Sequence, residues 1–176
     1  MLDSYFRDNG LVKQQLDSYN RFINDIEQVI TEYGRFSIPV KHQFRLGEDF
    51  ADEERWDFRF ANKLYKSTTN HKNDDKSVIK VHPMMCRLRD LNYESDVKVD
   101  LIYNRVKINS ETNEETVVWE KTIPKIPLAE LPVMVRSQWC RLSENTEEER
   151  VRMGECPYDQ GGYFIVRGSE KVVVGQ

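Results

Sequence analysis

The stretch Asp96–Asn109, which reads DVKVDLIYNRVKIN, decides the fold prediction. Apolar and polar side chains alternate along it, and a period of two is typical of a strand that buries one face. After a polar turn, an apolar pattern resumes in Thr116–Ile123, which reads TVVWEKTI. Two such segments joined by a short polar connection predict a long β-hairpin.

The residues on either side of this hairpin extend the β-rich region. Arg55–Lys66 (RWDFRFANKLYK) alternates aromatic with charged residues and predicts a further strand. Pro124 and Pro127 predict an irregular crossing after the hairpin, because proline removes a donor from the hydrogen-bond ladder. Leu131–Val135 then predicts a short apolar strand.

The N-terminal part of the chain predicts a long helix. Between Val12 and Tyr33, apolar residues recur in steps of three and four, which places them on one face of a helix. Asp8 or Asn9 can cap its start, and Gly34 is expected to end it in the left-handed conformation. The spacing also suits a coiled coil, but about three heptads are few for one, so packing on a sheet is favoured.

The C-terminal third predicts a short helix followed by a tight hairpin. Thr146–Glu149 has the pattern of a capping box, and Gly154 is expected to end the helix that it starts. Tyr163–Val166 and Lys171–Val174 are apolar segments that flank the turn Arg167–Glu170. The predicted fold class is therefore α+β: a long N-terminal helix on a mixed, mainly antiparallel sheet, with one short extra helix.

Composition limits the classes of protein to which the chain can belong. Of 176 residues, 39% are hydrophobic and 11% aromatic, enough for one packed domain. No apolar run approaches the ~20 residues of a membrane helix, the start has no secretory signal, and three widely spaced cysteines favour a reducing compartment. We therefore expect a soluble intracellular domain that does not contact a membrane.

The charge balance excludes a self-sufficient nucleic-acid binder. Lys and Arg number 26 against 30 Asp and Glu, which gives a formal net charge of −4, and no segment is a basic arm. Such binders normally carry a basic patch or stripe. Any nucleic-acid contact would depend on a few placed cations within a larger assembly.

No catalytic set stands out in the sequence. Cys140 and Cys156 lack a histidine base at a suggestive spacing, so a core or surface position is favoured for both. His71 lies in the polar segment Ser67–Lys76, which is expected to be a solvated loop without a second metal ligand. Gly161–Gly162 would suit a phosphate-binding nest, but a tight turn explains the pair equally well and is favoured.

One pair of cations leaves two interpretations open. Arg87 and Arg89 are two residues apart and share a face if the backbone is extended, so they would suit a phosphate or a carboxylate. Asp90, Glu94 and Asp96 are nearby acidic partners. A structural salt bridge is favoured over phosphate binding.

Four stretches of the sequence resemble one protein family. Cys86–Tyr93 is similar to a family segment that reads ARLRNLTY, and Leu131–Ser137 is similar to one that reads LPIMLRS. The other two are Gly10–Asn20, followed by Phe22, and Glu155–Val172, which is similar to ECPFDMGGYFIINGSEKV. Taken in their order along the chain, the four stretches resemble the second-largest subunit of multisubunit RNA polymerases. They are most similar to the form found in RNA polymerase II, and archaeal and RNA polymerase III homologues remain alternatives.

The resemblance implies a position within a much longer subunit. The chain would be the N-terminal portion of the domain called the protrusion. Residues 1–45 would form its helical segment, and residues 46–176 its β-rich part, incomplete at the C-terminus. Its abrupt end after an apolar strand agrees with a truncated piece. The resemblance to RNA polymerase II also implies a location in the nucleus.

The resemblance further implies which chemistry lies elsewhere. In the family, the two large subunits form the cleft that synthesises RNA with magnesium, and the aspartates that hold the main ion belong to the largest subunit. The zinc site and catalytic basic residues of the second subunit lie beyond this stretch. We therefore expect no cofactor and no catalytic residue in this chain. The implied partners are the largest and other subunits, template DNA, the RNA–DNA hybrid and initiation factors.

The resemblance assigns candidate nucleic-acid contacts to the C-terminal hairpin. Lys171, which begins the predicted second strand, is the best candidate for a phosphate contact, and Gln176 matches a family position nearby. Arg167 replaces a common asparagine and would add a cation. Clustering of Lys171 with Arg167 or Arg136 on one exposed face would favour this role. One alternative is an ion pair of Lys171 with Glu170 or another surface carboxylate. The other is a scaffold that contacts only proteins, which the balanced charge favours.

Overall fold

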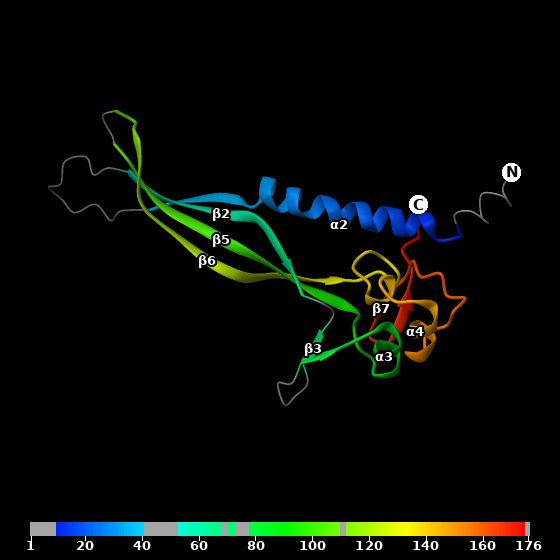
Figure 1. Cartoon of the computed structure of the whole chain (residues 1–176). Coiled ribbons are helices and arrows are strands. Elements are labelled where there is room, and N and C mark those ends of the chain that lie inside the picture. Colours follow the sequence, from blue (N-terminus) through cyan, green and yellow to red (C-terminus); the bar gives the residue numbers. More distant parts are fainter. Residues whose placement is uncertain (1–9, 41–52, 68–69, 73–77, 110–111, 175–176) are drawn as a thin grey trace, which may run out of the picture. The chain divides into compact units, whose positions relative to one another are not determined.

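The α+β fold class is confirmed by the computed structural model, which describes residues 10–40, 53–67, 70–72, 78–109 and 112–174 (Figure 1). The described chain forms two compact units. The first unit contains residues up to 25 together with 66–97 and 128 onward, and the second contains 26–65 and 98–127. The expected division of a protrusion at residues 45 and 46 stays a prediction. None of the described helices is both long and apolar enough to cross a membrane.

The core of the first unit is built from segments distant in sequence. The backbone amide of Tyr93 donates to the carbonyl of Ile165 at 2.9 Å, and the amide of Val133 donates to the carbonyl of Tyr93 at 2.8 Å. The amide of Val135 reaches the carbonyl of Tyr163 at 2.8 Å. The fully buried side chains around these bonds are those of Val81, Cys86, Tyr93, Val133, Val135, Cys140, Leu142 and Ile165.

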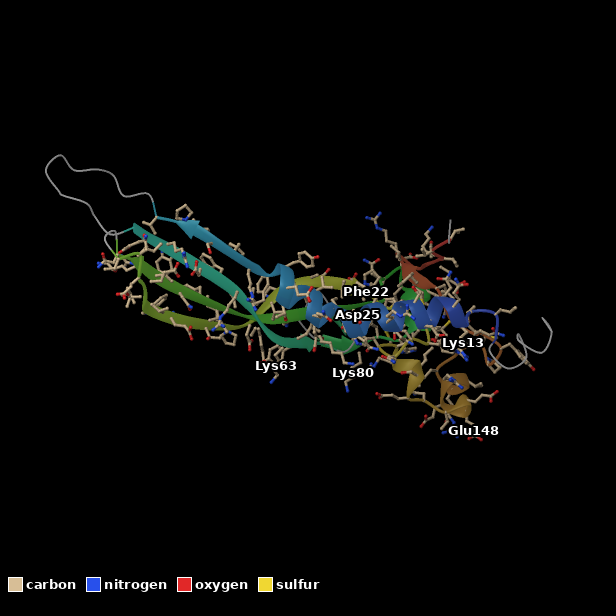
Figure 2. The ribbon with its side chains drawn as sticks, turned by 90° about the horizontal axis from the view of Figure 1, so that it is seen from above. Lys13, Phe22, Asp25, Lys63, Lys80 and Glu148 are labelled. Carbon is tan, nitrogen blue, oxygen red and sulfur yellow. The ribbon has the colours of Figure 1, made fainter. Side chains whose placement is uncertain are left out.

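The predicted long helix is α2 (Lys13–Tyr33), and its N-terminal half packs on the first unit. Tyr19 and Ile23 are buried with Met134, and the Tyr19 hydroxyl donates to the carbonyl of Pro132 at 2.7 Å. The rings of Tyr19 and Phe164 meet edge to face, 5.6 Å apart. The helix therefore packs on its own chain, as predicted, whereas Phe22 on α2 remains half exposed (Figure 2). The proposed caps at positions 8 and 9 lie outside the described residues.

Gly34 ends α2 for a different reason from the one predicted. It is absent from the glycines with a positive φ, so the helix does not end in a left-handed residue. A Cβ at this position would collide with the carbonyl oxygen of Ile30 and the ring of Phe60. The Gly34 carbonyl also accepts the Phe60 amide at 3.1 Å. Glycine is therefore required by the close approach of helix and strand.

The four-stranded sheet has the order β1-β2-β5-β6. β1 (Arg35–Pro39) is antiparallel to β2 (Glu53–Lys66), and β5 (Glu94–Ile108) precedes β6 (Glu115–Pro132) along the chain. Both predicted strands of the hairpin are confirmed and are longer than expected. The apolar alternation of β5 buries Val97 and Val99, as the period of two requires.

Two predictions about the end of this hairpin were wrong. Pro124 and Pro127 do not mark an irregular crossing but lie inside β6. β6 is an edge strand, where a missing amide donor is tolerated. Leu131–Val135 is not a separate strand either, because β6 ends at Pro132 and Val133–Val135 continues as a buried segment without strand structure.

The remaining elements are short. β3 (Asn70–Lys72) pairs with β4 (Val78–Lys80), so the prediction of a loop at His71 was wrong for the backbone. α3 (Pro83–Leu88) precedes β5, and β6 is followed by a 3-10 turn, η1 (Arg141–Ser143), and by α4 (Glu147–Arg152). The capping box is confirmed: the Thr146 amide donates to Glu149 Oε2 at 2.8 Å, and the Glu149 amide donates to Thr146 Oγ1 at 3.3 Å.

The Gly34→Ala substitution is expected to lower the free energy of unfolding by about 1–3 kcal/mol, because the added methyl group overpacks the junction of α2 and β2. Urea unfolding of the chain measures the effect. Glu27→Ala, at an exposed position on the same helix, is the control and is expected to change stability by no more than about 0.5 kcal/mol. Equal stability of the Gly34→Ala and Glu27→Ala variants would contradict the close approach.

Candidate nucleic-acid interface

The candidate site lies on the hairpin of β7 (Phe164–Val166) and β8 (Ser169–Lys171) in the first unit. Lys171 is opposite Phe164, and Glu170 is opposite the fully buried Ile165. Successive side chains of a strand point to opposite faces. Glu170 therefore shares the face of Ile165, whereas the exposed Lys171 lies on the other face. Lys171 ends β8 rather than beginning it, which corrects the predicted boundaries.

Glu170 is held by Arg87, on α3. Arg87 Nε donates to Glu170 Oε1 at 2.8 Å, and Arg87 Nη1 donates to Glu155 Oε2 at 3.0 Å. Its Nη2 contacts the hydroxyl of Tyr163, which donates to Asp159 Oδ2 at 2.5 Å. The guanidinium thus joins α3, the segment 155–163 and β8 through one planar group. We call Arg87, Glu155, Asp159, Tyr163 and Glu170 the arginine network.

The arginine network is partly removed from water. The side chain of Glu155 is only 2% exposed and that of Arg87 20%. Burial on its own would lower the pKa of Arg87, but its hydrogen bonds to Glu155 and Glu170 and its proximity to Tyr163 outweigh that effect and raise the pKa. Burial and the hydrogen bond to Asp159 raise the pKa of the Tyr163 hydroxyl. Arg87 therefore stays charged and Tyr163 stays neutral at physiological pH.

The structure decides between the two interpretations of Arg87. Arg87 is in a helix and Arg89 follows its end, so the extended backbone under which the two would share a face is not found. The favoured salt bridge is confirmed for Arg87, but its partners are Glu155, Asp159 and Glu170 rather than the acidic residues next to it in sequence. The sequence signal that was missed is the glutamate at the start of the segment ECPYDQGGYFI.

The turn of the hairpin is fixed against the loop after α3. Arg167 and Gly168 both have positive φ, 50° and 73°, as a two-residue turn of the primed class requires. The Arg167 amide donates to Asn92 Oδ1 at 2.8 Å, and the Gly168 amide donates to the Leu91 carbonyl at 3.1 Å. A Cβ on Gly168 would lie 2.6 Å from an Asp90 oxygen, so this position requires glycine.

The predicted contact residues are therefore distributed unevenly. Lys171 and Arg167 are both exposed on the one hairpin, whereas Arg136 is half buried. Within the described part of the chain, Lys171 forms no hydrogen bond or ion pair, and Glu170 is engaged by Arg87. The alternative pairing of Lys171 with Glu170 is thus not found. Gln176 lies outside the described residues.

The identity of the chain follows from comparison with known proteins. A family model described as RNA polymerase beta subunit matches residues 10–176. The chain belongs to the RNA polymerase beta subunit family. The resemblance drawn from the sequence motifs is therefore confirmed.

Relatives of this beta subunit chain include subunits of two RNA polymerases. It is 36% identical over 179 residues to DNA-directed RNA polymerase II subunit 2 of Arabidopsis thaliana. This alignment covers 100% of this chain and 15% of the relative. It is 36% identical over 178 residues to DNA-directed RNA polymerase II subunit RPB2 of Encephalitozoon cuniculi, with the same coverage. For DNA-directed RNA polymerase III subunit RPC2 of Schizosaccharomyces pombe the identity is 33%, covering 100% of this chain and 13% of the relative. The chain thus spans about one seventh of their length.

The segments that resemble the beta subunit family converge in the first unit. Cys86–Tyr93 supplies Arg87 and the buried Tyr93, and Leu131–Ser137 supplies the buried segment beneath the hairpin. Glu155–Ile165 supplies the carboxylates of the arginine network, and Gly168–Val172 supplies the turn and Glu170. These motifs build the support of the hairpin rather than a reaction centre.

Two other candidate features of this beta subunit chain are structural. The amide of Gly161 donates to Asp159 Oδ1 at 2.9 Å, and that of Gly162 donates to the Val135 carbonyl at 3.0 Å. Both amides are engaged, so the favoured turn is confirmed over a phosphate nest. Cys86 and Cys140 are buried, and burial raises the pKa of Cys86 to about 11 and also raises that of Cys140. In the described ranges, no three His, Cys, Asp or Glu side chains gather as metal ligands would.

Arg87→Ala is expected to lower the free energy of unfolding by about 3 kcal/mol or more, because it leaves the buried Glu155 carboxylate unpaired. Urea unfolding measures the loss. Adding Glu155→Gln should recover part of it, since a neutral amide oxygen can still accept the Met84 amide, which bonds Glu155 Oε1 at 2.6 Å. Arg152→Ala, at an exposed position, is the charge-matched control. A loss no larger than that of the control would show that the ion pair is unimportant.

Proposed function

We propose that this chain is the N-terminal protrusion portion of the second-largest subunit of a DNA-directed RNA polymerase, of the RNA polymerase II type. In this role it flanks upstream DNA and the RNA–DNA hybrid, and the exposed hairpin β7–β8 contacts the phosphate backbone. The observation that carries the proposal is the opposite orientation of Glu170 and Lys171. Arg87 holds the Glu170 carboxylate on one face of β8, where it stays 55% exposed, and the Lys171 charge is exposed on the other face.

A lysine in this position suits a general polymerase. The turn next to β8 is fixed by hydrogen bonds to Leu91 and Asn92, so the Lys171 backbone is held in place. Phosphate contacts position a nucleic acid but do not read its sequence. Arg167, exposed at the turn, supplies a second cation on the same hairpin. Gln176 is included in the proposed contact on the family resemblance alone.

The proposal assigns catalysis to the rest of the polymerase. RNA synthesis, its magnesium ions and the zinc site of the second subunit would belong to parts outside this chain, with the largest subunit and other subunits as partners. The assembled enzyme would act in the nucleus. The chain then forms part of the protein surface that flanks the cleft and needs no cofactor.

A scaffold for other subunits and initiation factors is the second candidate function. The observation that favours it is the exposure of apolar side chains along the edge strand β6, where Val117, Val118 and Trp119 are 56%, 54% and 42% exposed. Exposed apolar patches often mark protein interfaces. This function does not require any contact between the hairpin and nucleic acid.

Substituting Lys171→Ala in the assembled polymerase is expected to weaken the elongation complex modestly, with the logarithmic salt dependence of its stability reduced by about one unit. Dissociation of the complex over a series of salt concentrations measures the slope. Lys80→Ala removes an exposed charge on β4 and serves as the control. An unchanged slope in the Lys171→Ala enzyme would refute the hybrid contact and favour the scaffold.

A further inference from the structure

A second cationic feature occurs in the other unit, around the ring of Tyr65. Lys63 Nζ lies 5.0 Å from the centroid of this ring, and Lys125 Nζ lies 5.4 Å from it. Lys63 and Tyr65 are on β2, whereas Lys125 comes from β6, across the intervening strand β5. Two ammonium groups from different strands therefore converge on one aromatic side chain.

Asp100 on β5 links the two strands but does not neutralise both lysines. Its Oδ2 accepts the Tyr65 hydroxyl at 2.9 Å, and its Oδ1 accepts the backbone amide of Lys125 at 2.8 Å. In the chain as described, neither Lys63 nor Lys125 forms an ion pair with a carboxylate. We call Lys63, Tyr65, Asp100 and Lys125 the lysine–tyrosine cluster. Its charged side chains sum to one net positive charge.

The backbone of Lys125 is held in an unusual conformation. Its φ is 55°, in the left-handed region that residues other than glycine seldom adopt. The hydrogen bond that its backbone amide donates to Asp100 Oδ1 holds it there. Non-glycine residues with such backbones persist where their surroundings determine them, and they cluster at binding sites. Here the conformation accompanies a side chain that reaches back over Tyr65.

The arrangement favours an anion near the two lysines. The two ammonium groups lie no farther apart than about one Debye length at 0.1 M salt, ~10 Å, so their repulsion is only partly screened. The Tyr65 ring compensates in part through its negative face. An anion with a single negative charge would neutralise the cluster.

We propose that the lysine–tyrosine cluster binds a phosphodiester group of a nucleic-acid backbone. This inference rests on the proposed function, which brings nucleic acid to the subunit. A phosphodiester carries one negative charge and accepts point-charge contacts from lysine. Ammonium groups already lie over the Tyr65 ring, so the ring is not free to stack on a base, and the contact is independent of sequence. The cluster is thus a second phosphate contact, distinct from Lys171.

An acidic segment of a partner protein is the competing ligand class. Planar carboxylates are recognised best by the bidentate fork of arginine, whereas the cluster offers two separate ammonium groups. Phosphate fits two separate point charges without a planar fork. The cluster therefore favours a phosphodiester.

The test uses assembled polymerase carrying Lys63→Gln and Lys125→Gln together. The logarithmic salt dependence of elongation-complex stability is expected to fall by about one unit, as for the loss of one phosphate contact. Lys80→Gln with Arg152→Gln removes the same charge from exposed positions in the first unit and is expected to keep the wild-type slope. Lys63→Arg with Lys125→Arg keeps both charges and should also keep it.

The outcomes separate this proposal from the proposed function. An unchanged slope for the glutamine pair, with a lowered slope for Lys171→Ala, would overturn the cluster alone. Unchanged slopes for the glutamine pair and for Lys171→Ala would overturn both the cluster and the proposed hairpin contact. An unchanged slope together with weakened binding of an initiation factor would overturn the cluster in favour of an acidic protein ligand. A slope lowered equally by the arginine and glutamine pairs would also overturn it, because the charge would not then be the cause.

Discussion

The ion pairs of Arg87 are the interaction on which the first unit depends. One guanidinium bonds a nearly buried carboxylate, Glu155, and a strand carboxylate, Glu170, and it contacts Tyr163 as well. Removing Arg87 would leave the buried Glu155 carboxylate without a compensating charge in a poorly solvated place, which costs more than the pair itself contributes. The network therefore acts as a constraint. It requires α3, the segment 155–163 and β8 to meet at fixed positions, and the hairpin turn is then held against residues 90–92.

This constraint connects stability with the proposed contact to nucleic acid. Because successive side chains of β8 alternate between two faces, Lys171 lies on the face opposite to Glu170, the residue that Arg87 holds. The exposed lysine charge needs no basic surface around it. In the second unit, Asp100 accepts hydrogen bonds from the Tyr65 hydroxyl and the Lys125 amide. Among the described residues, the two ammonium groups of the lysine–tyrosine cluster form no ion pair with a carboxylate. A chain with a net charge of −4 can thus contact phosphates at a few fixed points.

Local patterns in the sequence predicted much of the fold. The helix α2, the strands β2, β5 and β6, and the capping box at Thr146 follow from periodicity and capping chemistry, which act over a few residues. The errors concern features set by distant residues. Gly34 is needed because Phe60 approaches it, the prolines of β6 are tolerated because that strand is at an edge, and Arg87 bonds carboxylates 68 and 83 positions away. Exposure of Arg167 and Lys171 was consistent with their predicted role, but the engagement of Glu170 by Arg87 required the structure.

Native-state hydrogen exchange tests most directly whether Arg87 fixes the hairpin. The amides of Arg167 and Gly168, which bond Asn92 and Leu91, report on the turn, and the amide of Phe60, which bonds Gly34, reports on the second unit. In an Arg87→Met variant, exchange at the two turn amides should accelerate by about tenfold or more, while exchange at Phe60 stays unchanged. Unaltered protection at Arg167 and Gly168 would contradict the account, because the hairpin would then be held without the guanidinium.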